Sequence, residues 1–166
     1  MRLPLPGRPR RDTPDLGVRR GERLLAWSDT SLGPVGGTRE ALYLPDRRVP
    51  WEEVQAAHWD RDSTALVVRE VGTWGEPQPV HRLSVAEPGR LLELVRERVS
   101  ASVVLTRHVP VVGGRGLRVV ARRAAAGDRA LTWAYELDEG LDPDDPGVRE
   151  AAERGLAAAR AEVEPG

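Results

Sequence analysis

The chain has 166 residues, enough for one compact domain or for one domain with an extension. Hydrophobic residues make up 40% of it, so the composition argues against a disordered protein, and the absence of cysteine excludes disulfides, thiolate metal sites and thiol chemistry. The net charge of −1 argues against a protein that binds nucleic acid through an overall basic surface.

The first predicted segment is a flexible tail over residues 1–20, which are rich in Pro, Arg and Gly. Because the rest of the chain is acidic overall, only this tail could bind RNA, an acidic protein or an anionic membrane surface through its charge. The candidate electrostatic contacts are Arg8, Arg10, Arg11, Arg19 and Arg20.

Besides cysteine, four residue types are absent, Lys, Asn, Ile and Phe, and the codons of these four are A/T-rich. We interpret this bias as the mark of a GC-rich genome, so the exclusive use of Arg does not by itself indicate phosphate binding. The start of the chain lacks the apolar core of a secretory signal, and no stretch of 18 apolar residues occurs. We therefore expect a cytoplasmic protein with no membrane span.

Short strands are predicted between residues 22 and 85. Residues 29–37 are rich in Gly and Pro and predict a turn between the first two strands, and residues 72–79 predict a loop before the last one. Apolar and β-branched runs bounded by turn residues predict strands at 22–28, 38–44, 64–71 and 80–85.

Residues 49–60 fit two structures. Pro50 suits the first position of a helical turn, with Glu52 and Glu53 favourably placed near its N-terminus. The alternation from Val54 to Asp60 suits a strand instead. We favour a tight turn over residues 50–53 followed by a strand, with residues 60–63 as the loop to the next strand.

After residue 88 the hydrophobic period changes and predicts an amphipathic helix over residues 88–106, begun by a proline. Valines in its second half lower its helix propensity, so packing must hold that half. Residues 108–116 predict a loop. Its Gly113–Gly116 segment could bind an anion through its backbone, but a strand rather than a helix follows, and we interpret it as a flexible turn.

The strongest β prediction is a hairpin of strands 117–122 and 131–137. Arg118 and Arg122 lie on the polar face of its first strand, and Glu136 predicts pairing with them across the hairpin. Its other face carries large aromatic side chains that must be buried.

A final helix is predicted after the hairpin, with Asp145 as its N-cap and Pro146 as its first residue. The acidic run 138–145 lacks the spacing of a calcium loop and is interrupted by two prolines, so we interpret its carboxylates as partners of this helix N-terminus. We expect residues 108–166 to pack on the same core as the preceding unit.

The segments 21–26, 38–44, 49–54 and 65–68, followed by one amphipathic helix, resemble a bacterial pleckstrin-homology-like domain. The chain as a whole looks like actinobacterial proteins of this type. For residues 21–107 the resemblance implies an α+β fold, a curled antiparallel sheet that forms a half barrel capped by the helix. The hairpin and the final helix fall outside it.

The same resemblance implies a non-enzymatic binding or scaffolding role without a cofactor. It carries over no catalytic residue. The eukaryotic relatives bind phosphoinositides through basic residues in the first inter-strand loop, whereas residues 29–37 here contain one acid and no Arg.

The residues themselves also predict no catalytic or metal site. His58, His81 and His108 lack the close spacing of metal ligands. No serine lies in a G-x-S-x-G elbow. Trp74 differs from the other four tryptophans because it lies in a Gly-rich loop, as a lid over the core or as a contact for a partner. With Arg47 and Arg48 it forms our candidate partner-contact set.

We therefore expect an interaction or scaffold module that binds a protein partner, either by strand addition at a sheet edge or at the Trp74 loop. One alternative is a nucleic-acid-associated protein that uses the Arg-rich tail. A second is a small-ligand binder or an enzyme of unrecognised type.

Overall fold

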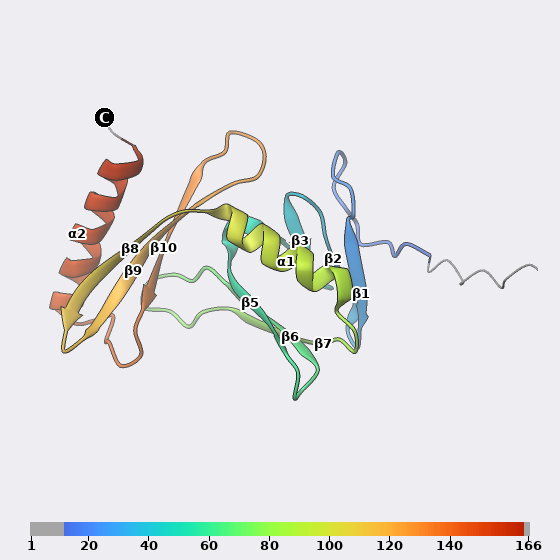
Figure 1. Cartoon of the computed structure of the whole chain (residues 1–166), viewed down its shortest axis with the longest axis horizontal. Helices are drawn as coiled ribbons and strands as arrows, with labels where there is room; N and C mark the ends of the chain where they lie inside the picture. Colours follow the sequence, from blue (N-terminus) through green and yellow to red (C-terminus); the bar gives the residue numbers. More distant parts are fainter. Residues whose placement is uncertain (1–11, 165–166) are drawn as a thin grey trace, which may run out of the picture.

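The computed structural model describes residues 12–164. These residues form an α+β fold of three antiparallel sheets and two helices, with the N-terminal sheets at one end and the C-terminal helix at the other (Figure 1). The first sheet has the order β1-β2-β3-β4, the second β5-β6-β7 and the third β10-β9-β8. Every pair of neighbouring strands is antiparallel.

The first sheet contains two strands that the sequence did not predict, its second and its fourth. Its strands are β1 (Ala26–Thr30), β2 (Gly33–Gly37), β3 (Ala41–Tyr43) and β4 (Arg48–Pro50). The prediction of a turn over residues 29–37 was therefore wrong for β2. A Cβ atom on Gly36 would lie 2.9 Å from the backbone carbonyl oxygen of Ala26, and one on Gly37 would lie 2.8 Å from Leu94 Cδ2 and 3.0 Å from the ring of Trp51. These glycines are required by close packing, not by a turn.

The second sheet agrees with the sequence. The tight turn is confirmed as a 3₁₀ helix, η1 (Trp51–Glu53), and it is followed by β5 (Val54–Asp60), β6 (Ala65–Glu70) and β7 (Val80–Ser84). At the β5–β6 turn, Asp60 accepts hydrogen bonds from Ser63 and Arg82, both at 2.6 Å. With the backbone N–H groups of the turn, they lower the pKa of Asp60 to about 2.

The predicted helix ends early and becomes a strand. Helix α1 (Gly89–Ser102) is followed directly by β8 (Val103–Val112), so the prediction of a helix to residue 106 and of a loop over 108–116 was wrong. The valines of this segment lose little rotamer freedom in a strand, which explains the switch. The glycine turn is shorter than predicted: Gly113 and Gly114 form it with φ of +55° and +76°.

The third sheet and the last helix follow as predicted. Strands β9 (Arg115–Arg123) and β10 (Leu131–Leu137) form the predicted hairpin, and α2 (Pro146–Val163) follows. Asp145 is confirmed as the N-cap, because its Oδ1 accepts a hydrogen bond of 2.7 Å from the Gly147 N–H. Helix α2 packs on β8 and β9.

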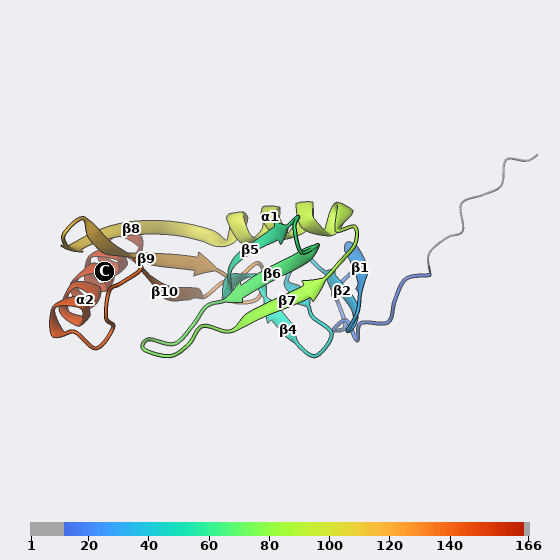
Figure 2. The ribbon, with the colours of Figure 1, turned by 90° about the horizontal axis from the view of Figure 1, so that it is seen from below.

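The hydrophobic side chains form two clusters, whereas we expected one shared core. The first cluster joins the first two sheets to α1, which contacts β1, β2 and β5 and lies along them in Figure 2. The second cluster joins the third sheet to α2 through residues such as Val119, Val148 and Ala152. We call the residues 12–102 the first unit and the residues 103–164 the second unit.

Arg122 joins the two units. It is only 3% exposed. Its Nη2 donates to the carbonyl oxygen of Gln55 in β5 at 2.8 Å, and its Nη1 donates to Ser102 Oγ at 2.9 Å and to the carbonyl oxygen of Val99 at 3.3 Å. Burial lowers the pKa of Arg122, although the charge of Glu136 partly opposes this.

The predicted pairing of Glu136 is therefore confirmed for one arginine only. Glu136 Oε2 lies 2.7 Å from Arg118 Nη2 across the β9–β10 pair. Arg122 lies too deep for this surface pairing and makes no ion pair among the described residues. The alternation of β9 indicated its polar face correctly, but that face turns out to be partly covered by the first unit.

Glu22 fixes the segment before β1 to the first sheet. Its carboxylate accepts hydrogen bonds from Thr38 at 2.7 Å, from Tyr43 at 2.8 Å and from Arg48 at 3.2 Å. Burial would raise the pKa of Glu22, but these three hydrogen bonds outweigh it and lower the pKa below 4.5. The Arg19 N–H donates to the Tyr43 hydroxyl at 3.0 Å, so the described end of the predicted tail contacts the sheet.

Neither helix within residues 12–164 is long and apolar enough to span a membrane.

Replacing Arg122 by Ala should lower the free energy of unfolding by about 3 kcal/mol, because it removes three hydrogen bonds at the junction, including the buried one to Ser102, and opens a cavity. Urea denaturation measures this change. Arg118→Ala on the same strand serves as the control, since an exposed ion pair contributes under about 1 kcal/mol. Equal losses in the two variants would show that Arg122 does not hold the junction.

Replacing Glu22 by Gln should make the protein less stable at neutral pH by about 1–2 kcal/mol. A carboxyl group whose pKa is lowered in the folded state stabilises it above the unfolded pKa, and this stabilisation is lost as the pH falls through the folded pKa. The difference between wild type and variant should therefore be constant above about pH 5 and shrink below pH 4.5. Urea denaturation between pH 3 and pH 7 tests this, with the exposed Glu93→Gln as control; a difference independent of pH would contradict the assignment.

Candidate functional site

The loop between β6 and β7 reaches from the first unit to the second (Figure 1). Its residue Trp74 donates a hydrogen bond of 3.1 Å from Nε1 to the carbonyl oxygen of Pro143. The rings of Trp74 and Tyr135 meet edge to face, with their centroids 5.1 Å apart and their planes at 84°. Trp74 thus packs with the second hydrophobic cluster, although its loop belongs to the first unit.

A cleft of about 560 Å³ lies between this loop, β5, β6 and the outer part of the β9–β10 pair. This volume falls in the range of small-molecule sites, about 300–1,000 Å³. Its aromatic wall is formed by Trp74 and Tyr135. The principal polar residues that line it are Gln55, Arg69, Gln78, Arg118 and Glu136. We call it the inter-unit cleft.

Most polar groups of the inter-unit cleft are already paired. The Gln78 side-chain amide donates to Gln55 Oε1 and, at 2.8 Å, to the carbonyl oxygen of Glu70. Arg118 donates to Glu136 from Nε at 2.9 Å. Among the described residues, Arg69 makes no side-chain hydrogen bond or ion pair, and it is exposed. Arg69 is therefore a charged donor that remains available to a ligand.

Tyr135 lines the cleft, and its hydroxyl is a neutral group. Burial raises its pKa above 10, the charge of Arg160 partly opposes this, and the charge of Glu153 adds to the rise. The hydroxyl therefore keeps its proton at neutral pH, and the two charges that act on it belong to α2 and not to the cleft lining.

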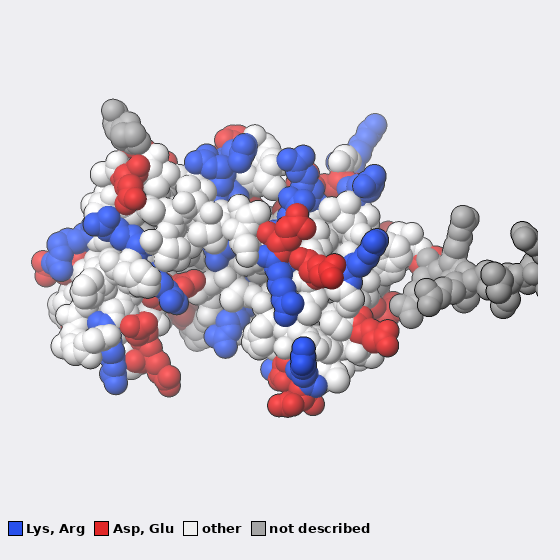
Figure 3. Space-filling view, viewed as in Figure 1, with Lys and Arg blue, Asp and Glu red and all other residues white. Residues whose placement is uncertain are grey.

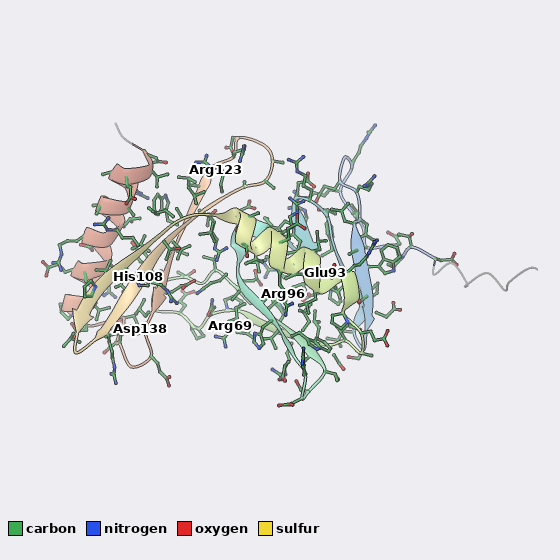
Figure 4. The ribbon with its side chains drawn as sticks, viewed as in Figure 1. Arg69, Glu93, Arg96, His108, Arg123 and Asp138 are labelled. Carbon is green, nitrogen blue, oxygen red and sulfur yellow. The ribbon has the colours of Figure 1, made fainter. Side chains whose placement is uncertain are left out.

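The three histidines of the chain lie apart from one another. Within the described part of the chain no three His, Asp or Glu side chains converge as metal ligands. His58 and His108 are exposed on separate strands, β5 and β8, and His81 Nε2 lies 2.5 Å from Glu70 Oε2. His108 and Asp138 both line a cavity of about 330 Å³ at the outer end of the third sheet, where Figure 4 labels them.

The predicted contact residues do not all lie together. Trp74 lines the inter-unit cleft. Arg47 instead pairs with Glu70 at 3.0 Å, and Arg48 pairs with Glu22 at 3.2 Å, so both hold the first unit together. Of the predicted tail contacts, Arg8, Arg10 and Arg11 lie outside the described residues, while Arg19 and Arg20 precede β1 and are exposed.

The sequence missed Arg69, Gln55 and Gln78 as cleft residues. The sequence indicated Arg69 only weakly, because it is a charged residue that follows four apolar residues in a predicted strand. The sequence indicated Tyr135 more clearly, because it lies on the face of the predicted hairpin that had to be buried. The sequence did not indicate Gln55 and Gln78, since nothing in the pattern around them distinguishes them from other surface residues.

The surface charges are mixed. Figure 3 shows arginines and acids interspersed over the face drawn, without a broad belt of one sign. This face therefore lacks the extended basic surface that a nucleic-acid-binding protein uses.

Comparison with models of protein families, with curated proteins and with solved structures finds no match to this chain.

Proposed function

We propose that this chain is a non-enzymatic interaction module that binds a protein partner in the inter-unit cleft. The observation that carries the proposal is the combination of Arg69, which lacks a partner among the described residues, with the aromatic wall of Trp74 and Tyr135 in one cleft. Aromatic and Arg side chains dominate the energetics of protein interfaces.

A pleckstrin-homology-like architecture for the first unit supports a binding role. Four strands and then three strands, in two antiparallel sheets, are followed by a helix that packs on both sheets. We propose that these elements correspond to the half barrel and capping helix of that fold. A fold alone does not define a function, so the proposed function rests on the residues of the inter-unit cleft.

The cleft selects the chemistry of the partner. An apolar side chain would pack against the edge-to-face pair of Trp74 and Tyr135, and a carboxylate beside it would accept hydrogen bonds from Arg69. A short protein segment that carries an apolar residue next to Asp or Glu meets both requirements. The volume of about 560 Å³ accommodates only a few such side chains.

The edge of the third sheet at β8 is poorly suited to pairing with a strand of a partner, so we favour binding in the cleft over strand addition there. β8 is one of the two edge strands of this sheet, and its pairing with β9 shifts register between Val103 and Leu105 and again between Pro110 and Val112. Bulges and proline are typical of edges that resist further pairing. We therefore assign the partner contact to the cleft.

The experiment selects ligands from a random peptide library with the purified full chain. The selected peptides should share an apolar residue adjacent to a carboxylate. Arg69→Gln should weaken their binding, measured by isothermal titration calorimetry, about tenfold, the loss of one charge-assisted pair.

Arg61→Gln is the matched control, because Arg61 is equally exposed but lies at the β5–β6 turn away from the cleft. Its affinity should stay within about twofold of wild type. The proposal fails if the selected peptides bind wild type and Arg69→Gln equally, or if the library yields no ligand that saturates.

A further inference from the structure

A second cavity, of about 300 Å³, lies on another part of the junction between the units. It is bounded by the β2–β3 turn, the last turns of α1, the end of β9 and the β9–β10 loop. It shares no lining residue with the inter-unit cleft. Four arginines, Arg39, Arg98, Arg123 and Arg129, contribute to its lining, and no Asp or Glu does.

This concentration of positive charge departs from the composition of the chain. Basic and acidic residues are nearly equal in number, 25 and 26, so a cavity lined by four arginines and no acid is not expected from composition alone. Figure 4 labels Arg123 beside the β9–β10 loop, and Figure 3 shows Arg side chains gathered over that loop.

The arginines are poorly satisfied within the described residues. Arg98 Nε is buried and has no hydrogen-bond partner, and its guanidinium reaches only the exposed neighbour Glu97, at 3.6 Å. Arg123 Nη1 donates to the carbonyl oxygen of Arg129 at 3.2 Å. That bond fixes the loop but supplies no negative charge.

The backbone of the loop presents Arg129 in an uncommon conformation. Arg129 has a φ of +54°, in the left-handed region that residues other than glycine rarely adopt. Such strain persists where the surrounding structure enforces it and is common at ligand contacts. Asp128, the acid of the same loop, accepts a hydrogen bond from the Ala130 N–H at 3.0 Å and does not line the cavity.

The four guanidinium groups repel one another, weakly where water screens the exposed Arg39 and Arg129, and an anion bound in the cavity would compensate their charge. Guanidinium forks match phosphoryl oxygens in two-point hydrogen bonds, and phosphoryl groups carry more charge for their size than a carboxylate. The only hydroxyl of the lining, Ser102, already donates to the Val99 carbonyl oxygen at 2.7 Å and accepts from Arg122. The arginines are thus the groups that would select the ligand.

We propose that this arginine cavity binds a compact anion with phosphoryl groups, carried either by a soluble small molecule or by a lipid headgroup. Its volume is at the lower end of small-molecule sites and suits one or two phosphoryl groups with a small substituent. This site is separate from the inter-unit cleft, and the proposal stands without the proposed function.

The test titrates the full chain with inorganic pyrophosphate at constant ionic strength by isothermal titration calorimetry. Wild type should bind with a dissociation constant below about 1 mM. Arg98→Gln and Arg39→Gln should each weaken binding about tenfold, the loss of one charge-assisted contact. Arg39 is exposed and makes no ion pair among the described residues, so its variant keeps the fold even if Arg98→Gln does not.

Arg96→Gln is the matched control, because Arg96 lies on the same helix, is exposed and is outside the cavity lining. It should bind pyrophosphate as wild type does. Vesicles of phosphatidylcholine with and without phosphatidic acid identify the source of the group. If the chain binds pyrophosphate but not the vesicles, the ligand is a soluble molecule. If it binds vesicles with phosphatidic acid, and Arg39→Gln weakens that binding, the ligand is a lipid headgroup.

Two results would overturn the proposal. One is the absence of saturable binding to both pyrophosphate and phosphatidic acid vesicles. The other is equal binding by wild type, Arg39→Gln, Arg98→Gln and Arg96→Gln, which would show attraction by the whole surface and not by this cavity.

Discussion

The buried guanidinium of Arg122 is the interaction on which the arrangement of the two units depends. It has been removed from water without an opposite charge beside it, which is costly, and its main compensation is three hydrogen bonds to neutral acceptors. Those acceptors belong to the end of α1 and to the start of β5. Because hydrogen bonds to a charged donor require close and directed contacts, they hold β9 of the second unit in one position against the first unit.

Both candidate sites follow from that position. On one side of Arg122, the β6–β7 loop meets the third sheet through Trp74, and the inter-unit cleft forms between them. On another side, the end of β9 and its following loop approach the end of α1 and bring the four arginines together. Ser102 links the two regions, since it accepts a hydrogen bond from Arg122 and also lines the arginine cavity. A change in the junction would therefore alter both surfaces.

Local patterns predicted those elements whose signals are local. The strand over 64–71, the hairpin of β9 and β10, and the Asp145 cap with Pro146 all rest on neighbouring residues, and the structure confirms them. The predictions were wrong where contacts between residues far apart in the sequence determine the local structure. Gly36 and Gly37 resemble turn residues in sequence, but within a strand the Ala26 carbonyl oxygen and the Trp51 ring leave no room for a Cβ atom at these two positions.

The same distinction applies to the sites. Trp74 could be selected from its unusual place in a Gly-rich loop, but its neighbours Tyr135 and Pro143 lie more than sixty residues further along the chain. The four arginines come from separate elements, and each one taken alone resembles an ordinary surface residue. The alternation of polar and apolar residues along β9 places Arg122 on the polar face of the strand, so it was expected to be exposed. Nothing in the sequence indicates that the first unit covers that face.

The relative orientation of the units in solution is the most direct test of this account. Backbone residual dipolar couplings measured separately for residues 26–102 and 103–163 report whether the two units share one orientation in a weakly aligned sample. The account predicts that a single alignment tensor fits both sets, because Arg122 holds the units as one body. Two different tensors would contradict it, since the junction would then be mobile and neither cavity would have a fixed shape.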